Sequence, residues 1–567
     1  MHDCLFRNAL IFDGTGAAPT VGDVAVTDGC IAATGSALNV SARKVIAADD
    51  LALMPGIIDS HTHFDAQVTW DPYVRPSPAL GVTTAVIGNC GFTIAPCKPQ
   101  DRDLTMRNLT QVEGMSLDVL RQGIAWDFET FPEYMAQLRR KRSAVNLAAY
   151  VGHSSVRTYV MGGDASKRTA TDSEVAQMQA IVRDAMEAGA VGFASSTSPA
   201  HNGEGGLPMP SRLADDREMR ALVVAMGECG HGVYMLTKGG HTPVPFLESL
   251  AADSGRPVMI AALLHNGTNP GAVFDDLDAI AAANSRGHAL IGQVSCCPLT
   301  MDFTMGSPYP VEGLASWKPA LGLHGDALVA VLASRTFRDG VRAELATATT
   351  FRLFNGEWDK VQVVETTTAA NARHEQQTIA DIARNERHDP LDVMLDLAIE
   401  ENLQTVFTAQ LLNADEVAVG RMLNHPDSNV SLSDAGAHLT VYNDAGFGLH
   451  LLGHWARELG VMSTSEAVRR LTSHPARVFG MRGRGVIREG YAADLLLFDP
   501  QRVGRGAKRR VFDLPGGAPR LTTDAVGVHG VWVNGRLIAD SDGIVESTPL
   551  AGELLTDFSA GTAPCKP

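Results

Sequence analysis

Two histidines separated by one residue follow a short apolar run near residue 60. The run is Ile57-Ile58, and the histidines are His61 and His63. In a strand, residues i and i+2 point to the same face, with Cα atoms about 7 Å apart. Both imidazoles can therefore reach one point, which is the beginning of a divalent metal site. The alternative is two ordinary histidines at a strand end, one solvated and one hydrogen-bonded.

Two further residues of metal-binding type stand at the ends of predicted strands. Cys90, as a thiolate, would be a strong zinc ligand, although a buried cysteine is often only a small hydrophobe. Asp434 ends an alternation in which Val430, Leu432 and Asp434 share one face. A carboxylate beside a metal can ligate it, accept a proton from its water and return that proton to a leaving group. The alternative for Asp434 is an N-cap or turn aspartate.

The elements that must position these residues alternate between strands and helices from about residue 56. Strands are expected at 83–87, 145–151, 190–193, 232–236, 257–263 and 429–434, with helices such as 173–188 between them. This alternation predicts a parallel sheet with helical crossovers, and enough units are present for a (β/α)8 barrel. Active sites of such barrels lie at the carboxyl ends of the strands. The residues at these ends are His61, His63, Cys90, His153, Lys238, His265 and Asp434.

Residues 298–390 fit the alternation poorly. The stretch 298–319 is rich in proline and glycine and carries Met301, Met305, Tyr309 and Trp317. We interpret it as a long loop near the barrel mouth and hypothesise a lid or substrate wall. The alternative is a surface excursion with a small core of its own.

Several motifs, taken together and in this order, carry a resemblance to a known family. The motifs are Pro55-Gly56-x-Ile58-Asp59-x-His61-x-His63, Gly88-Asn89-Cys90-Gly91, Val151-Gly152-His153 with Arg157, Gly192-Phe193-Ala194-Ser195, and Ser433-Asp434-Ala435-Gly436-Ala437-His438. With them the chain resembles the amidohydrolase superfamily, and more closely its D-aminoacylase-like branch of N-acyl-D-amino-acid deacylases. The resemblance covers nearly the whole chain.

The resemblance implies a zinc-dependent enzyme in which Cys90 is a metal ligand and Asp434 is first the general base and then the general acid. It also implies a small β-sandwich built from both termini. The expected domains are 1–55 (sandwich), 56–480 (barrel with the insertion at 298–390) and 481–567 (sandwich and tail). The tail after about 553 is expected to be loosely ordered.

Two strand ends depart from the family pattern. D-aminoacylases have a histidine in a His-x-Arg setting on the fifth strand, where this chain has Thr237 and no arginine follows. On the sixth strand Ala262 replaces the expected histidine, unless a shift brings in His241 or His265. We therefore expect one zinc ion, with two as the alternative. The missing arginine means that specificity for D-amino acids does not carry over.

Six residues are predicted to bind substrate, each with a surface or structurally satisfied side chain as its alternative. Histidines in this set could hydrogen-bond a substrate carbonyl or carboxylate, or orient a metal ligand. The arginine could pair with an acidic substrate, and the lysine could be carboxylated or bind substrate. These residues are His153, Arg157, His201, Lys238, His265 and His438.

Composition points to an acidic enzyme that acts on small molecules. The 567 residues are 45% apolar and carry a net charge of -17, which argues against nucleic acid or an anionic membrane as partner. The eight cysteines are scattered, so no disulfide framework is expected. No signal peptide or membrane span is recognisable, and the cytoplasm is the expected compartment. The sequence is compatible with a homo-oligomer.

The sequence thus predicts a zinc-dependent hydrolase of a non-peptide carbon–nitrogen bond. A linear amide, either an N-acyl amino acid or an N-acyl amine, is the favoured substrate, cleaved by a metal-activated water. The same chemistry would serve a cyclic amide, carbamate or urea, or a deamination. A non-catalytic binding protein on a decayed barrel is the alternative from another class.

Overall fold

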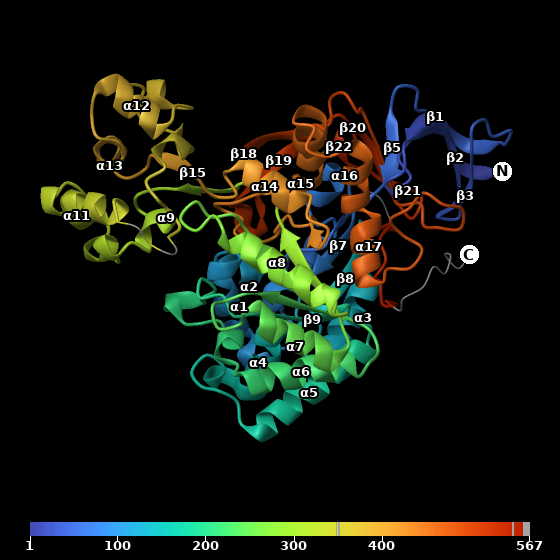
Figure 1. Cartoon of the computed structure of the whole chain (residues 1–567), viewed down its shortest axis with the longest axis horizontal. Coiled ribbons are helices and arrows are strands. Elements are labelled where there is room, and N and C mark those ends of the chain that lie inside the picture. Colours follow the sequence, from blue (N-terminus) through green and yellow to red (C-terminus); the bar gives the residue numbers. More distant parts are fainter. Residues whose placement is uncertain (348, 350–351, 547–548, 559–567) are drawn as a thin grey trace.

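Eight parallel strands form the central sheet of this computed structural model, which describes residues 1–567 except 348, 350–351, 547–548 and 559–567. The strand order is β16-β12-β11-β10-β9-β8-β7-β6. Helices cover the outside of the sheet (Figure 1). The strands are β6 (Ile57–Asp59), β7 (Val82–Ile87), β8 (Asn146–Gly152), β9 (Gly192–Ser196), β10 (Val233–Thr237), β11 (Val258–Leu263), β12 (Leu290–Val294) and β16 (Ser428–Asn429). Helices between them include α4 (His153–Met161), α5 (Asp172–Glu187), α6 (Asp216–Gly227), α7 (Val244–Ser254) and α8 (Ala272–Ser285).

The two edge strands of this sheet approach each other through serine side chains. The Ser60 backbone N–H donates to Ser431 Oγ at 3.0 Å, and Ser60 Oγ donates to the Ser431 carbonyl at 2.6 Å. Just beyond, the Asp434 N–H donates to the His61 carbonyl at 3.0 Å. The predicted barrel is confirmed, and its closure places the segments carrying His61 and Asp434 side by side.

Two details of the barrel differ from the sequence expectation. The strand expected at 429–434 is regular only over Ser428–Asn429, and residues 430–434 have no regular secondary structure. Strand β12 was not predicted, since Gly292 and Gln293 interrupt its short apolar run.

Strands from both termini join in one sheet of nine strands. Its order is β22-β21-β20-β17-β5-β1-β2-β3, with β4 paired to β1. Strand β5 pairs antiparallel with β17, which links the two ends of the chain, and a turn at Asn534-Gly535 joins β20 to β21. We propose the domain division 1–55, 56–480 and 481–567 on this basis. The strands are β1 (His2–Ile11), β2 (Thr20–Thr27), β3 (Cys30–Gly35), β4 (Ala42–Ala47), β5 (Ala52–Pro55), β17 (Leu495–Phe498), β20 (Val528–Val533), β21 (Arg536–Asp540) and β22 (Gly543–Ile544). A separate hairpin pairs β18 (Gly504–Leu514) with β19 (Ala518–Val526).

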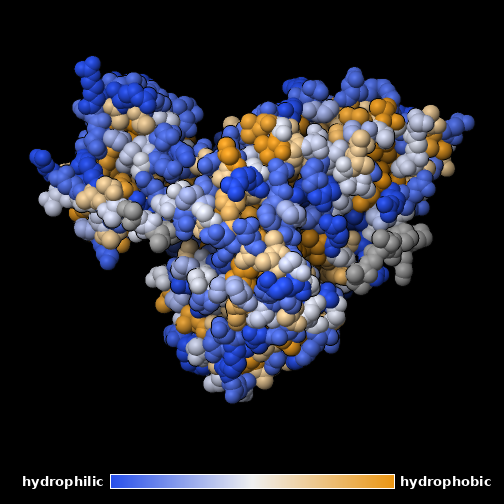
Figure 2. Space-filling model, viewed as in Figure 1, coloured by the Kyte–Doolittle hydropathy of each residue, from blue (hydrophilic) through white to orange (hydrophobic). Residues whose placement is uncertain are grey.

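Residues 299–412 form a folded unit, which includes nearly all of the stretch 298–319 that was interpreted from the sequence as a long loop. Three antiparallel strands in the order β13-β15-β14 pack with helices around a hydrophobic core of their own that includes Trp317 and Phe407. The alternative of an excursion with its own core therefore describes the region better, because its aromatic residues pack on one another. The unit projects from the rest of the molecule (Figures 1 and 2). Its elements are β13 (Leu299–Phe303), α9 (Tyr309–Glu312), α10 (Gly325–Leu332), α11 (Arg335–Leu345), β14 (Val361–Glu365), α12 (Ile379–Glu386), α13 (Pro390–Glu400) and β15 (Val406–Leu412).

The start of the tail is ordered against the barrel. Leu147 in β8 donates its N–H to the Glu553 carbonyl at 2.8 Å, and Leu555 donates to the Leu147 carbonyl at 2.7 Å. The expectation of loose order from 553 is therefore wrong for these residues, and residues 559–567 lie outside the described part. No helix within the described residues is long and apolar enough to cross a membrane.

Candidate metal centre and active site

Three side chains at the mouth of the barrel bring their ligand atoms together. His61, His63 and Cys90 offer atoms that all lie within 4.8 Å of one another. Cys90 Sγ is 3.5 Å from His61 Nε2 and 3.9 Å from His63 Nε2. Asp434 Oδ1 is 3.0 Å from His63 Nε2 and 3.6 Å from His61 Nε2. The four residues predicted to hold a metal thus converge on one place.

Unusual backbone conformations aim two of these side chains. Cys90 has φ 58° and Asp434 has φ 56°, a left-handed region that non-glycine residues seldom occupy. The turn around Cys90 also needs glycine, because a Cβ on Gly91 would lie 2.6 Å from the Ala194 carbonyl oxygen. Tight packing of the loop that follows β7 therefore holds the thiol toward the histidines.

Residues outside the ligand set orient both imidazoles. His61 Nδ1 lies 2.7 Å from Gln293 Oε1 in β12. Gln293 Nε2 is occupied as a donor to Ser60 Oγ at 3.0 Å, so Oε1 accepts from His61 Nδ1–H. His63 Nδ1 lies 3.3 Å from Glu113 Oε1, a carboxylate just after α1 (Arg102–Val112). Each ring therefore presents Nε2 to the shared place, as metal-binding histidines do.

The electrostatics of this cluster favour an ionised carboxylate and thiolate. Burial alone would raise the pKa of Asp434, but the hydrogen bond from His63 and the charges of both histidines bring it below its ordinary value. Burial would also raise the pKa of the Cys90 thiol, but the charge of His61 and hydrogen bonds from both histidines lower it to about 7. Burial raises the pKa of Glu113 against the opposing effect of His63.

The donor set fits a zinc ion. Two imidazoles, one thiolate and one carboxylate are the ligand types that Zn²⁺ binds, and the histidines and Cys90 are buried. No other cluster of at least three such side chains occurs among the residues that the structure describes. At the fifth strand end, Thr237 donates its hydroxyl to Cys90 Sγ at 3.1 Å. His241 is exposed, and neither His241 nor His265 lines the cavity above the cluster.

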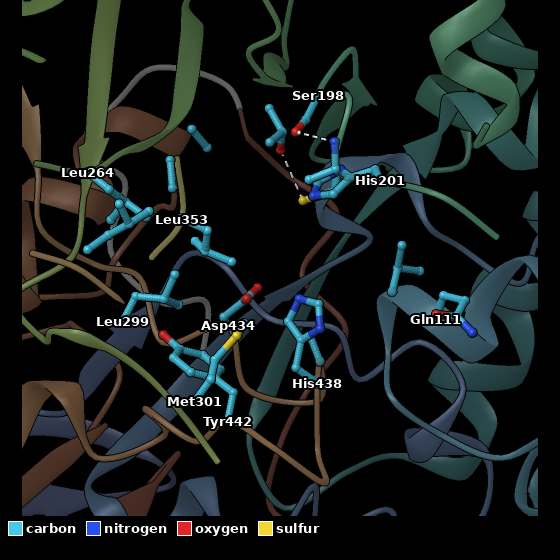
Figure 3. Close-up of a pocket in the computed structure, with 18 of the residues that line it drawn as sticks. Gln111, Ser198, His201, Leu264, Leu299, Met301, Leu353, Asp434, His438 and Tyr442 are labelled. Carbon is cyan, nitrogen blue, oxygen red and sulfur yellow. Dashed lines mark hydrogen bonds between the residues drawn. The ribbon is translucent and has the colours of Figure 1, made fainter. Parts of the chain in front are cut away.

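A cavity of about 860 Å³ opens above the cluster. Figure 3 shows Leu264, Leu299, Met301 and Leu353 on one side of Asp434, with Ser198, His201 and Gln111 on the other. Leu299, Met301 and Leu353 come from the folded insertion, which therefore supplies part of the cavity wall. A metal-type cluster at the base of a large pocket is the arrangement expected of an active site.

Comparison with known proteins agrees with this geometry. A sequence model described as the amidohydrolase family matches residues 44–539. The chain belongs to the amidohydrolase family. As a member it is a metal-dependent hydrolase of carbon–nitrogen bonds other than peptide bonds, as the sequence predicted.

Relatives of this amidohydrolase match over almost their whole length. An N-acyl-D-aspartate deacylase of Alcaligenes xylosoxydans xylosoxydans is 27% identical over 95% of this chain and 92% of the relative. A D-aminoacylase of the same organism is 28% identical over 94% and 93%. The structure of an N-acyl-D-glutamate deacylase from Bordetella bronchiseptica with zinc and a phosphonate inhibitor is 25% identical, with TM-score 0.67 over 98% of this chain and 100% of that chain.

Three of the six predicted substrate-binding residues line the cavity of the amidohydrolase. They are His201, His438 and Lys238. His201 Nδ1 lies 2.6 Å from Ser196 Oγ, and burial, then the charge of His438, lowers its pKa to about 3, so the ring is neutral. Lys238 Nζ is already 2.6 Å from Asp276 Oδ1.

The other three lie outside the cavity. His153 Nδ1 is 2.8 Å from Ser195 Oγ, and its Nε2 is 2.8 Å from Glu218 Oε1. Arg157 donates to the second oxygen of Glu218, and both side chains of this ion pair are fully buried. The backbone of the buried His265 accepts from the Asn413 N–H at 2.9 Å and donates to the Asn413 side-chain Oδ1 at 2.7 Å. Glu218, from α6, pairs with the side chains of both His153 and Arg157. These two residues were predicted to bind substrate, and their side chains are instead used within the protein.

Sequence reasoning missed the residues that orient the histidines. Glu113 follows a helix with no motif around it, so nothing in the chain marks it. Gln293 did leave a signal, because a single amide interrupts the apolar residues of Leu290–Val294. Recognising that stretch as the seventh strand would have placed Gln293 on a barrel strand beside the site.

Proposed function

We propose that this amidohydrolase cleaves a linear amide, releasing an amine and a carboxylate. The observation that carries the proposal is the convergence of His61, His63, Cys90 and Asp434 below the cavity. The names of the relatives, deacylases of N-acyl-D-amino acids, support this reaction class over deamination. A zinc ion held by these four residues would acidify a water molecule and polarise the amide carbonyl.

Asp434 is the residue proposed to move the proton. Its carboxylate is held ionised beside His63, so it can accept the proton of the attacking water. The same carboxyl then protonates the amine nitrogen as the carbon–nitrogen bond breaks. One residue thus serves as base and acid in turn.

His201 is proposed to donate a hydrogen bond to the substrate carbonyl. Ser196 Oγ accepts the Ser198 N–H at 3.2 Å, which leaves its own proton for His201 Nδ1. The neutral ring then carries its proton on Nε2 and is a donor toward the cavity that it lines. A preorganised donor of this kind stabilises the oxygen on which negative charge develops.

We propose one zinc per chain, with two as the alternative. Thr237, Ala261 and Ala262 occupy the ends of strands five and six, where no described residue supplies further ligands. A D-aminoacylase with a binuclear centre, 25% identical with TM-score 0.65, is described as activated by one metal and attenuated by the second. A single-metal enzyme is therefore consistent with the chemistry of that relative.

The test combines metal content with product analysis. Wild type, Asp434→Asn, Cys90→Ser and the control Cys229→Ser, a half-buried cysteine away from the cavity, are compared. We expect about one zinc in wild type and control, less in Cys90→Ser, and zinc without turnover in Asp434→Asn. The assay measures free amine and ammonia from a panel of N-acyl compounds. Near-normal turnover by Asp434→Asn, or release of ammonia alone, would overturn the proposal.

A further inference from the structure

For a substrate carboxylate, the cavity offers no arginine and no unpaired lysine among the residues that the structure describes. Among the described residues that line it there is no arginine, and Lys238 is the single lysine. The Lys238 ammonium lies 2.6 Å from Asp276 Oδ1 and is therefore already paired. Glu312, from the folded insertion, lines the same cavity and brings a carboxyl group to it. A buried carboxylate needs a charged, hydrogen-bonded partner, so an N-acyl amino acid would meet an unfavourable environment.

One side of the cavity is instead hydrocarbon. It is formed by Leu264, which follows β11, and by four residues of the folded insertion. Those four are Leu299, Met301, Leu353 and Leu412. Figure 3 shows Leu264, Leu299, Met301 and Leu353 gathered together across Asp434 from His201. These side chains remain partly exposed to the cavity, apart from the buried Met301, and so can bury an apolar group of a ligand.

The opposite side is polar, with hydroxyl, amide and imidazole groups. Ser198, Asn202 and Gln111 line it together with the neutral His201 and the glycines of the loop after β9. Hydroxyl and amide groups can hydrogen-bond an alcohol, amide or ether, and none of them balances a full charge. The two sides meet at Asp434, where the scissile bond would lie (Figure 3).

We propose that the substrate is an uncharged linear amide with one hydrocarbon arm and one neutral polar arm. This substrate class rests on the proposed amide hydrolysis and narrows it. The insertion binds the hydrocarbon arm, and the loop after β9 binds the polar arm. The relatives cited above are named as deacylases of N-acylated amino acids, which carry a carboxylate. In this proposal the chain differs from them in the amine that carries the acyl group, which has no charged group in the substrate.

The first experiment compares four matched amides by kcat/KM. N-octanoylethanolamine has both arms, N-acetylethanolamine lacks the hydrocarbon, and N-octanoylglycine and N-octanoyl-D-alanine carry a carboxylate. We expect N-octanoylethanolamine to exceed N-acetylethanolamine by about 100-fold, which corresponds to burial of three to four of its extra methylenes at roughly fourfold each. It should exceed the two carboxylate compounds by about 100-fold, because their charge would be buried without a cationic partner. Preference for either carboxylate compound, or equal rates with the acetyl and octanoyl amides, would overturn the proposal.

Variants of each wall locate the two arms. Leu299→Glu should lower kcat/KM for N-octanoylethanolamine far more than for N-acetylethanolamine, whereas the matched control Leu321→Glu, on an exposed part of the insertion, should change neither. Gln111→Arg, at an exposed lining position, should raise kcat/KM for N-octanoylglycine about tenfold or more by supplying the missing cation. Lys238→Met should leave the ratio of the two octanoyl substrates unchanged. A KM increase confined to N-octanoylglycine in this variant would show that Lys238 leaves Asp276 to bind carboxylates, and would overturn the proposal.

A binding measurement separates this inference from the proposed reaction. Titration calorimetry with zinc-loaded Asp434→Asn uses the same four amides and needs no turnover. Selective binding of N-octanoylethanolamine, without hydrolysis of any amide by wild type, would reject the reaction and retain the substrate class. Hydrolysis of all four amides, with tightest binding of N-octanoyl-D-alanine, would retain the reaction and reject the substrate class.

Discussion

The barrel contains two buried clusters that pair histidine with a carboxylate, and they differ in how the histidine nitrogens are used. His153, at the end of β8, has both ring nitrogens occupied, by Ser195 and by Glu218. His61 and His63, after β6, each have one nitrogen held from outside the ligand set, and the other faces Cys90 and Asp434 below the cavity. The position of a histidine at a strand end therefore does not show whether it is a metal ligand or a structural residue. A ligand is marked by a ring nitrogen that the protein's own contacts leave unoccupied.

The largest expected effect is loss of the metal from one cluster alone. His63→Ala should reduce zinc content and lower amide hydrolysis by at least about 1000-fold, because it removes a ligand. His153→Ala should keep its zinc and lose stability instead. Metal analysis and urea unfolding on both variants make the comparison. Loss of zinc from His153→Ala at a temperature where it remains folded would remove the distinction between the clusters.

The next effect is on stability. Glu218→Gln leaves the guanidinium of Arg157 buried without its carboxylate, and both side chains are 0% exposed in the structure. Breaking a buried pair on one side costs about 3–5 kcal/mol. Urea unfolding should show this loss, with zinc content unchanged in the folded protein. Glu174→Gln is the matched control, because its ion pair with Arg168 lies at the surface and should contribute about 1 kcal/mol or less. Equal losses in the two variants would contradict the assigned role of the buried cluster.

The free energy of unfolding should depend on pH through the Glu218 carboxylate. Burial alone would raise the pKa of Glu218, but its contacts with His153 and Arg157 lower it from 4.5 to about 2. A lowered pKa means that the stabilisation is complete above pH 4.5 and is lost as the pH falls toward 2. The full difference corresponds to about 3 kcal/mol. Unfolding free energies of wild type and Glu218→Gln, measured between pH 6 and 3, should converge as the pH falls; a constant difference would contradict the prediction.

The sequence predicted the barrel and named the four residues that the structure brings together below the cavity, because local pattern and the family motifs mark them. The spacing of His61 and His63 and the strand before them are visible in a window of a few residues, and the family motifs add Cys90 and Asp434. Their convergence depends on the closure of the barrel between β6 and β16, and the alternation of strands and helices was enough to predict that.

The rest depended on contacts between distant elements. Nothing near His153 in the sequence indicates that Glu218, which is 65 residues away, occupies its Nε2. The insertion looked like a loop because its prolines and glycines hide short elements, although its aromatic residues form a core. A substrate wall was hypothesised here from the sequence, but the residues that form it, Leu299 and Leu353 beside Leu264, are identified only in the structure.

The smallest predicted effect tests whether the contact made by His61 Nδ1 prepares this residue as a metal ligand. Gln293→Met keeps the volume of the side chain but removes the acceptor of His61 Nδ1–H. Loss of such a partner lowers metal affinity about 10–100-fold, because the ring loses its fixed tautomer and orientation. Competition with a zinc chelator measures this change. The control is Ser60→Ala, since Ser60 bonds to Gln293 Nε2 without touching His61 through its hydroxyl. If both variants weaken zinc binding equally, closure of the barrel, and not orientation of the imidazole, sets the affinity. If only Gln293→Met weakens zinc binding, the contact of His61 Nδ1 with Gln293 prepares the other ring nitrogen as a metal ligand. In His153, by contrast, Glu218 occupies the second ring nitrogen and makes it unavailable as a ligand.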